Sequence, residues 1–269
     1  MRITFILAMA AAGALATSPV LAETLTFSDP VGDDNGPGNY LYPTDPVYLP
    51  GSFDLTGLTV EYDEKNVEFS VDVNSKLKDP WGMEVGFAVQ MAFIHIDTDG
   101  VEGSGHTGGM PGTNLKFAEA NAWEKVVVLS PQPKSRVASE VRSKAEDWRD
   151  DVLIPGRTRG KGKTISGKIK RKEFGDSDPA TWSFQVVMQS NEGFPSKTDL
   201  LTRKVNEYEG QHRFGGGTDY DCDPHVMDVL AGKGSGADDE VAAQHEMLKF
   251  ACSEDGEAEA LATLTMVKQ

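Results

Sequence analysis

The residues with the clearest capacity for chemistry form an acidic loop near the start of the chain. Asp29, Asp33, Asp34 and Asn35 lie within seven residues, among glycines and prolines that favour tight turns. Calcium takes six to eight oxygen ligands, and carboxylate and amide oxygens supply them in proteins. The composition predicts a calcium site, although the spacing is not that of an EF-hand. The alternative is that these residues only form turns.

A second acidic cluster follows a strongly apolar run. Asp97 and Asp99 lie at the end of a strand predicted over Phe87–Asp97, and Glu102 follows them. The ends of strands and the loops beside them can meet at one end of a β-sandwich. We therefore expect Asp97 and Asp99 to converge with the first loop and to complete its calcium site.

Three aromatic residues are candidates for binding carbohydrate. Tyr40 and Tyr42 lie beside prolines in the first loop, and Trp81 follows Asp79-Pro80 in another predicted loop. An exposed ring offers a flat apolar face on which a sugar can stack. The alternative for each ring is packing in the core.

Haem binding is a second possibility. A CxxCH motif is absent, which excludes covalent c-type attachment. A b-type haem needs axial ligands, and the candidates are Met83, Met91, His95, His106 and Met110. Met91 and His95 would lie on the same face of one strand, about 13 Å apart, so they cannot bind opposite faces of one haem.

Motifs for catalysis are weak. GxSxG and HExxH are absent, although a glycosidase needs only two carboxyl groups at the right separation. We expect a protein that binds rather than catalyses.

The segment Arg157–Lys172 carries eight basic residues, and it is either a solvated hairpin or a docking surface for an acidic protein partner.

The start of the chain predicts export. Residues 1–22 have a basic Arg2, an apolar stretch and small residues before a cleavage site after Ala22, as in a signal peptide. We expect a periplasmic or secreted protein without a membrane span after cleavage. Its net charge of −16 disfavours nucleic acid as a partner.

The two cysteines, Cys222 and Cys252, predict one disulfide bond in an oxidising compartment.

The rest of the chain reads as an all-β protein. Short alternating or β-branched runs bounded by turn residues predict an antiparallel β-sandwich, with residues 23–269 as a single domain. One or two short helices are expected near the C-terminus, over Val226–Leu230 and Asp238–Phe250, and a last strand over Leu261–Val267. The other predicted strands are Thr24–Ser28, Phe53–Tyr62, Val67–Val73, Lys125–Leu129, Thr164–Arg171 and Trp182–Gln189.

The order of motifs resembles the C-terminal domain of glucodextranase, a DOMON-like β-sandwich that is also appended to some bacterial amylopullulanases. The resemblance begins with DPxGDDxGPGxYxYP at residues 29–43 and GSFDLTG at 51–57, and continues with DPWG at 79–82. Its closing motifs are Gly215-Gly216, DPxVMD at residues 223–228 and Met247-Leu248. Nearly the whole mature chain is covered, without the catalytic domain of glucodextranase.

The resemblance implies a non-catalytic module that recognises carbohydrate or a component of the cell envelope. DOMON-like relatives divide between sugar binders and carriers of haem b. The main alternative is therefore a haem b electron-transfer subunit of a periplasmic redox complex. A third is a structural partner in an envelope assembly.

Overall fold

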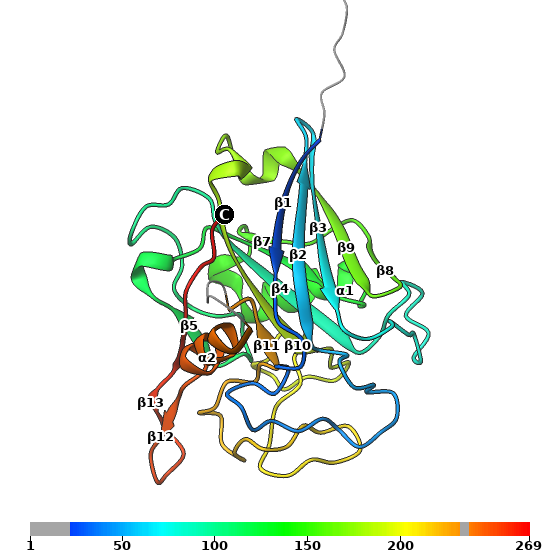
Figure 1. Ribbon diagram of the computed structural model, residues 1–269, viewed down its shortest axis with the longest axis vertical. Helices are drawn as coiled ribbons and strands as arrows, with labels where there is room; N and C mark the ends of the chain where they lie inside the picture. Colours follow the sequence, from blue (N-terminus) through cyan, green and yellow to red (C-terminus); the bar gives the residue numbers. More distant parts are fainter. Residues whose placement is uncertain (1–21, 232–236) are drawn as a thin grey trace, which may run out of the picture.

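Two five-stranded sheets lie face to face and form the β-sandwich that the sequence predicts (Figure 1). The computed structural model describes residues 22–231 and 237–269. The predicted signal peptide therefore lies, except for Ala22, outside the described residues. Every pair of neighbouring strands in the two sheets is antiparallel except β6 and β7.

The first sheet is buried on one face only. Its strands, in spatial order, are β1 (Glu23–Ser28), β2 (Leu55–Tyr62), β3 (Asn66–Val73), β9 (Thr164–Lys170) and β8 (Thr158–Lys161). Side chains alternate across a strand, and in β3 every second residue, from Val67 to Val73, is buried. The apolar face packs against the second sheet, and the other face meets solvent.

The second sheet is buried on both faces. Its strands, in spatial order, are β11 (Asp228–Val229), β10 (Ser183–Ser190), β4 (Gln90–Asp97), β6 (Lys125–Leu129) and β7 (Val152–Leu153). All residues of β4 and β10 are buried, because a third layer covers the face turned away from the first sheet. That layer contains α1 (Lys134–Lys144), α2 (Ala237–Met247) and the parallel pair β5 (Leu115–Phe117) and β14 (Ala262–Leu264).

Most of the predicted strands are present to within a few residues. The helical turn predicted over Val226–Leu230 is wrong, because Asp228 and Val229 form an edge strand paired with β10. Helix α1 was not predicted; only Val137 and Val141 of it are buried, which leaves a weak apolar pattern. The remaining elements are the hairpin strands β12 (Ala251–Cys252) and β13 (Ala258–Ala260), and four 3-10 turns at Glu119–Asn121, Glu146–Trp148, Arg171–Phe174 and Pro179–Thr181.

Two long loops cover one end of the sandwich. The N-terminal loop (residues 29–54) and the long loop (residues 191–227) lie side by side at the bottom of Figure 1, in blue and in yellow. They pair through backbone hydrogen bonds, including both between Leu41 and Gly215. Gly216 has φ +86°, and a Cβ there would lie 2.1 Å from the Asn39 carbonyl oxygen. The two loops therefore pack as one layer.

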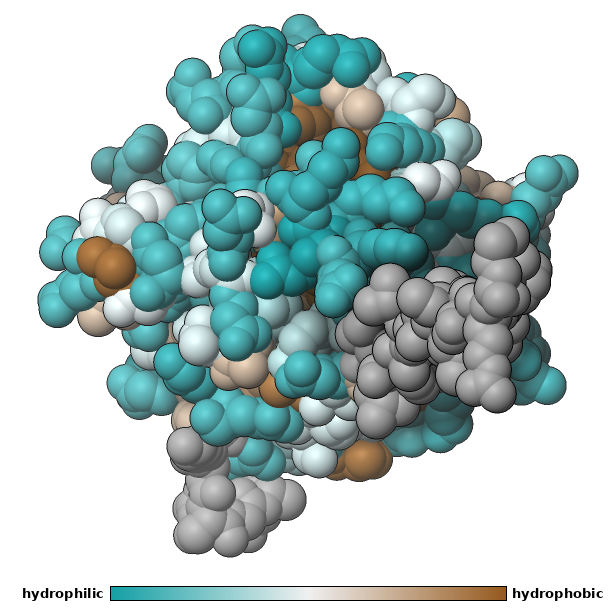
Figure 2. All heavy atoms as spheres, turned by 90° about the horizontal axis from the view of Figure 1, so that it is seen from above, coloured by the Kyte–Doolittle hydropathy of each residue, from teal (hydrophilic) through white to brown (hydrophobic). Residues whose placement is uncertain are grey.

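The protein surface is largely hydrophilic over the face seen in Figure 2, with isolated apolar side chains. Among the described residues, no helix is both long enough and apolar enough to span a bilayer.

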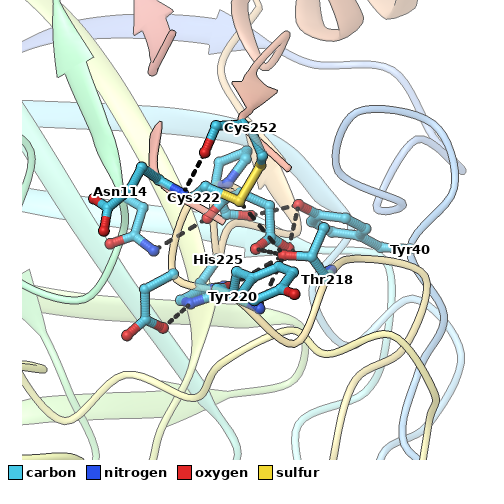
Figure 3. The surroundings of a disulfide bond; sticks show 12 residues. Tyr40, Asn114, Thr218, Tyr220, Cys222, His225 and Cys252 are labelled. Atoms are coloured by element: carbon cyan, nitrogen blue, oxygen red, sulfur yellow. Dashed lines mark hydrogen bonds and ion pairs between the residues drawn. A yellow bond between two sulfur atoms is a disulfide. The ribbon is translucent and has the colours of Figure 1, made fainter. Parts of the chain in front are cut away.

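A disulfide bond joins the long loop to the hairpin after α2. Cys222 and Cys252, 30 residues apart, form the bond that the sequence predicts (Figure 3). Next to it, the Asp223 carboxylate accepts hydrogen bonds from the backbone and hydroxyl of Thr218. The Tyr40 hydroxyl donates to the Pro224 carbonyl at 2.7 Å. The disulfide therefore holds a segment that also anchors the N-terminal loop.

Replacing both cysteines should destabilise the protein substantially. Without the cross-link the unfolded chain gains the entropy of a loop of this length, so we expect Cys222→Ala/Cys252→Ala to lose about 3 to 4 kcal/mol of unfolding free energy. Urea unfolding of the wild type and of the double variant measures this difference in unfolding free energy. A reductant should destabilise the wild type and leave the double variant unchanged. A double variant as stable as the oxidised wild type would contradict the assignment.

Candidate functional site

Four aspartates meet where the two loops join the sandwich, and we call them the acidic junction. Asp29 directly follows β1, Asp54 directly precedes β2, and Asp228 begins β11. Asp33 comes from the N-terminal loop. Carboxylate oxygens of Asp29, Asp33 and Asp228 lie within 4.8 Å of one another. The junction thus connects both ends of the N-terminal loop to the end of the long loop.

Only part of this oxygen set is hydrogen-bonded. Asp228 accepts from the Leu55 backbone N–H at 2.7 Å, and Asp29 accepts from that of Ala231 at 3.3 Å. In the four aspartates, the buried oxygens without a hydrogen-bond partner are Asp29 Oδ2, both carboxylate oxygens of Asp33, Asp54 Oδ1 and Asp228 Oδ1; Oδ1 of Asn35, two residues after Asp33, is a sixth. Asp33 is 1% exposed and Asp228 is fully buried. Buried polar atoms are normally paired, so these six unpaired oxygens need an explanation.

The electrostatics of the junction favour a cation. Burial, together with the neighbouring carboxylates, raises the pKa of Asp29 to about 9 and that of Asp33 to about 6. Burial also raises the pKa of Asp228 well above its usual range. Among the described residues, no lysine, arginine or histidine forms an ion pair with any member of the junction. When these carboxylates are ionised, no ion pair with a described residue therefore balances their charge.

Neighbouring groups hold the junction in shape. The Gly32 backbone N–H and the Asn74 side chain donate to Asp54 Oδ2 at 2.9 and 3.1 Å. Gln244 of α2 donates to the Asp33 carbonyl oxygen at 2.6 Å and accepts from the Val229 backbone N–H at 3.2 Å. These bonds orient the carboxylates without using the six unpaired oxygens.

Asp34, although predicted as a ligand, has a different role. Its carboxylate accepts a hydrogen bond from the Tyr42 hydroxyl, which in turn accepts from the Phe53 backbone N–H at 2.9 Å. Asp34 therefore fixes the N-terminal loop against the core, while its neighbour Asp33 lies in the junction.

The second predicted cluster is also present, with Glu124 in place of Glu102. Asp97, Asp99 and Glu124 have carboxylate oxygens within 4.8 Å of one another. Asp97 accepts from the backbone N–H groups of Asp99 and Gly100 and from the Ser183 hydroxyl. Its carboxylate is thus engaged in turn formation, in contrast to the unpaired oxygens of the junction.

The two acidic clusters do not converge, contrary to the sequence-based expectation. In the sheet, Asp97 pairs with Ser183 and Asp228 pairs with Met188. Met188 lies five positions after Ser183 in β10, which corresponds to about 17 Å along the strand. The register of β10 therefore places Asp97 and Asp99 away from the acidic junction.

The predicted aromatic residues differ in exposure. Tyr40 is 4% exposed and Trp81 is 38% exposed, whereas Tyr42 is half-buried. Tyr40 and Tyr42 belong to the apolar cluster between the two loops. The expectation that these tyrosines present exposed rings is therefore wrong, because their rings and hydroxyls are used to close the loop layer. Trp81 alone of the three presents a ring to solvent.

Trp81 is connected to a small pocket through the ring of Tyr48. It meets Tyr48 edge-on at 6.3 Å between centroids, and Tyr48 contacts His212 at 5.8 Å. His212 and Arg203 line a pocket of about 260 Å³ together with Phe194, whose side chain is 95% exposed. The sequence analysis did not single out Phe194; its exposure depends on how the long loop folds.

The five candidate haem ligands are not gathered around a cavity. Met91, His95 and Met110 are buried in packed surroundings, and Met83 is half-buried. His95 lies between Phe117 and Trp123, with ring centroids 4.6 and 5.3 Å away.

His106 bonds through Nε2 to Asp151 at 2.8 Å. None of the three principal cavities found among the described residues is lined by any of the five candidate haem ligands. Both ring nitrogens of His95 are buried without a hydrogen-bond partner in the described part of the chain, but the rings of Phe117 and Trp123 pack against it.

Sequence reasoning missed two members of the junction, Asp54 and Asp228. Both lie in blocks that carry the family resemblance, GSFDLTG and DPxVMD. The signal that could have found them is an aspartate at the boundary between a loop and a strand, in a block shared with the family.

A search of the curated proteins finds no match to this chain. A scan against protein-family models matches residues 24–267 to the C-terminal binding module, SLH-like, of glucodextranase. The match covers nearly all the described residues, including both loops and every aspartate of the acidic junction. The chain therefore belongs to the family of glucodextranase C-terminal binding modules.

Proposed function

We propose that this chain is an exported, non-catalytic module that binds one calcium ion at the acidic junction and carbohydrate at the loop-covered end. The observation that carries the calcium proposal is the set of six buried oxygens that lack a hydrogen-bond partner. The binding role itself is supported by membership of a family of binding modules.

Calcium suits this set of atoms better than other common metals. The candidates are all carboxylate or amide oxygens, which hard cations prefer, and neither sulfur nor imidazole is present among them. Calcium accepts six to eight such ligands in irregular geometry, whereas magnesium demands a regular octahedron and retains water. An ion here would join the two ends of the N-terminal loop, at Asp29 and Asp54, to β11 at Asp228.

Calcium should raise the thermal stability of the wild type but not of Asp33→Asn. At a calcium concentration about a thousandfold above the dissociation constant, the expected gain is about 4 kcal/mol, or about 10 °C in Tm. Asp33→Asn removes a junction charge and should lose most of this shift. Thermal unfolding of both proteins with and without calcium measures this rise in Tm.

Asp34→Asn is the matched control. The new amide oxygen can still accept from Tyr42, so this neighbouring variant should keep the full response to calcium. The proposed site would be contradicted if calcium raised the Tm of Asp33→Asn as much as that of the wild type. It would also be contradicted if Asp33→Asn and Asp34→Asn lost the same part of the calcium-dependent rise in Tm.

Calcium should reduce the loss of stability that accompanies rising pH. The folded-state pKa values of Asp29 and Asp33 are raised, to about 9 and about 6, above the unfolded value near 4. These groups bind protons on folding, so in calcium-free buffer their stabilisation is present near pH 4 and is lost as the pH rises through 6 towards 9.

Calcium binds the ionised carboxylates, so the stability that it adds should grow over the same range. The unfolding free energy is measured with urea at pH 5 and at pH 8, in calcium-free buffer and in buffer with calcium. A calcium effect of the same size at both pH values would argue against these carboxylates as the ligands.

For carbohydrate we propose the surface formed by Trp81 and the pocket that contains Phe194. Exposed rings stack on the apolar faces of sugars, and the pocket adds hydrogen-bonding groups from Arg203 and His212. The family is that of a module of glucodextranase, so dextran is the natural first probe.

Replacing Trp81 by Ala should weaken binding to dextran about tenfold, because one stacking contact is lost. Affinity electrophoresis in dextran gels measures this. Tyr208→Ala is the control, since Tyr208 is also an exposed aromatic residue but, unlike Trp81, makes no ring contact with Tyr48 among the described residues. Equal retardation of wild type and Trp81→Ala would exclude Trp81 from the binding surface.

A further inference from the structure

A large groove runs along the open edge of the sandwich. It has a volume of about 960 Å³ and lies between α1 on one side and β7 and β9 on the other. Residues 154–157, which cross from the second sheet to the first, contribute to its lining.

The groove is basic in a protein that is strongly acidic. Its lining contains two acidic residues, Asp150 and Glu173, against six basic ones: Lys134, Arg142, Arg149, Arg157, Lys168 and Lys170. The whole chain carries a net charge of −16. A concentration of positive charge against this background creates a local potential that attracts anions.

Three of the basic side chains are available to a ligand. Lys134, Arg142 and Arg157 are exposed, and none has a side-chain hydrogen bond or ion pair with any described residue. By contrast, Lys168 pairs with Glu68 at 2.8 Å. The unpaired cations lie on both walls, since Lys134 and Arg142 belong to α1 and Arg157 precedes β8.

The groove has the form expected for a chain-like ligand. It adjoins a second, smaller cavity of about 110 Å³, which shares Lys134, Ile154, Gly156 and Arg157 with it. Its floor is aliphatic and includes Val141, and its lining holds no aromatic residue. Recognition here must therefore rest on charge and on apolar contact rather than on ring stacking.

We infer that this groove binds an anionic polysaccharide through the carboxylates of its sugar units. The lining side chains are predominantly donors, and a polyuronate chain offers carboxylate and hydroxyl acceptors with apolar C–H faces for the floor. An acidic peptide would bring backbone N–H donors that need acceptors, which this lining supplies poorly.

The groove is independent of the sites proposed above. It includes Asn66, at the start of β3, whereas the acidic junction receives a hydrogen bond from Asn74, just beyond the other end of β3. Eight residues of a strand span about 26 Å. Binding at the groove therefore does not depend on Trp81 or on the carboxylates of the junction.

The test uses a hyaluronan decasaccharide and its carboxyl methyl ester as probes. The wild-type chain should bind the acidic form, more weakly as salt is raised, and should bind the neutral ester at least tenfold more weakly. The variant Lys134→Gln/Arg142→Gln/Arg157→Gln should lose about tenfold in affinity for the acidic form, since each exposed ion pair contributes modestly.

The control variant Lys76→Gln/Arg159→Gln/Lys161→Gln changes the net charge equally. Its three residues lie outside the groove lining, and none forms a side-chain ion pair with any described residue. It should retain affinity within about twofold. Equal losses in both triple variants would show general charge attraction and overturn the inference.

Two other outcomes would also overturn it. One is the absence of wild-type binding to the acidic decasaccharide. The other is tighter binding of poly-glutamate of equal charge, which would favour an acidic protein as the occupant. Trp81→Ala should bind the decasaccharide like the wild type, so failure of the dextran proposal and failure of this one are distinguishable.

Discussion

The repulsion among buried carboxylates at the acidic junction is the constraint on which the rest of this structure depends. Asp29, Asp33 and Asp228 have oxygens within 4.8 Å of one another. At an effective dielectric constant near 20, two ionised carboxylates at that separation repel by about 3 to 4 kcal/mol. Without a counter-ion they must take up protons or move apart, and at neutral pH proton uptake itself costs free energy.

The junction lies where the N-terminal loop and the long loop join the two sheets. Asp29 and Asp54 lie at the two ends of the N-terminal loop, and Asp228 directly follows the long loop. Gln244 brings in α2, and the disulfide between Cys222 and Cys252 encloses the segment that contains both Asp228 and Gln244. A cation at this point would stabilise the whole loop layer, which forms the pocket around Phe194 and contacts Trp81 through Tyr48.

The architecture places different binding chemistry at different ends of the sandwich. The loop-covered end presents Trp81 and Phe194, whose exposed rings suit neutral sugars. The groove beside α1 presents unpaired cations such as Arg142, which suit acidic sugars. If the proposed function holds, two such surfaces would allow one chain to contact two kinds of glycan.

The β-sandwich was predictable because alternating apolar residues mark strands such as β3, and the buried run of β4 is mainly apolar. Asp29 and Asp33 were found from composition. Asp228 was not, because its position depends on the pairing of β11 with β10, which local pattern does not encode.

The same limit explains the aromatic residues. Tyr40 and Trp81 both lie beside prolines, yet the partner loop buries Tyr40 and leaves Trp81 exposed. Helix α1 escaped notice because only its two buried valines, Val137 and Val141, carry the apolar pattern.

The most direct measurement is the number of calcium ions bound per chain, determined by equilibrium dialysis for the wild type and for Asp228→Asn. Asp228 is fully buried and carries one of the unpaired oxygens. The account predicts that the wild type binds one calcium ion that Asp228→Asn fails to bind. No bound calcium in the wild type, or the same amount bound by both proteins, would contradict it.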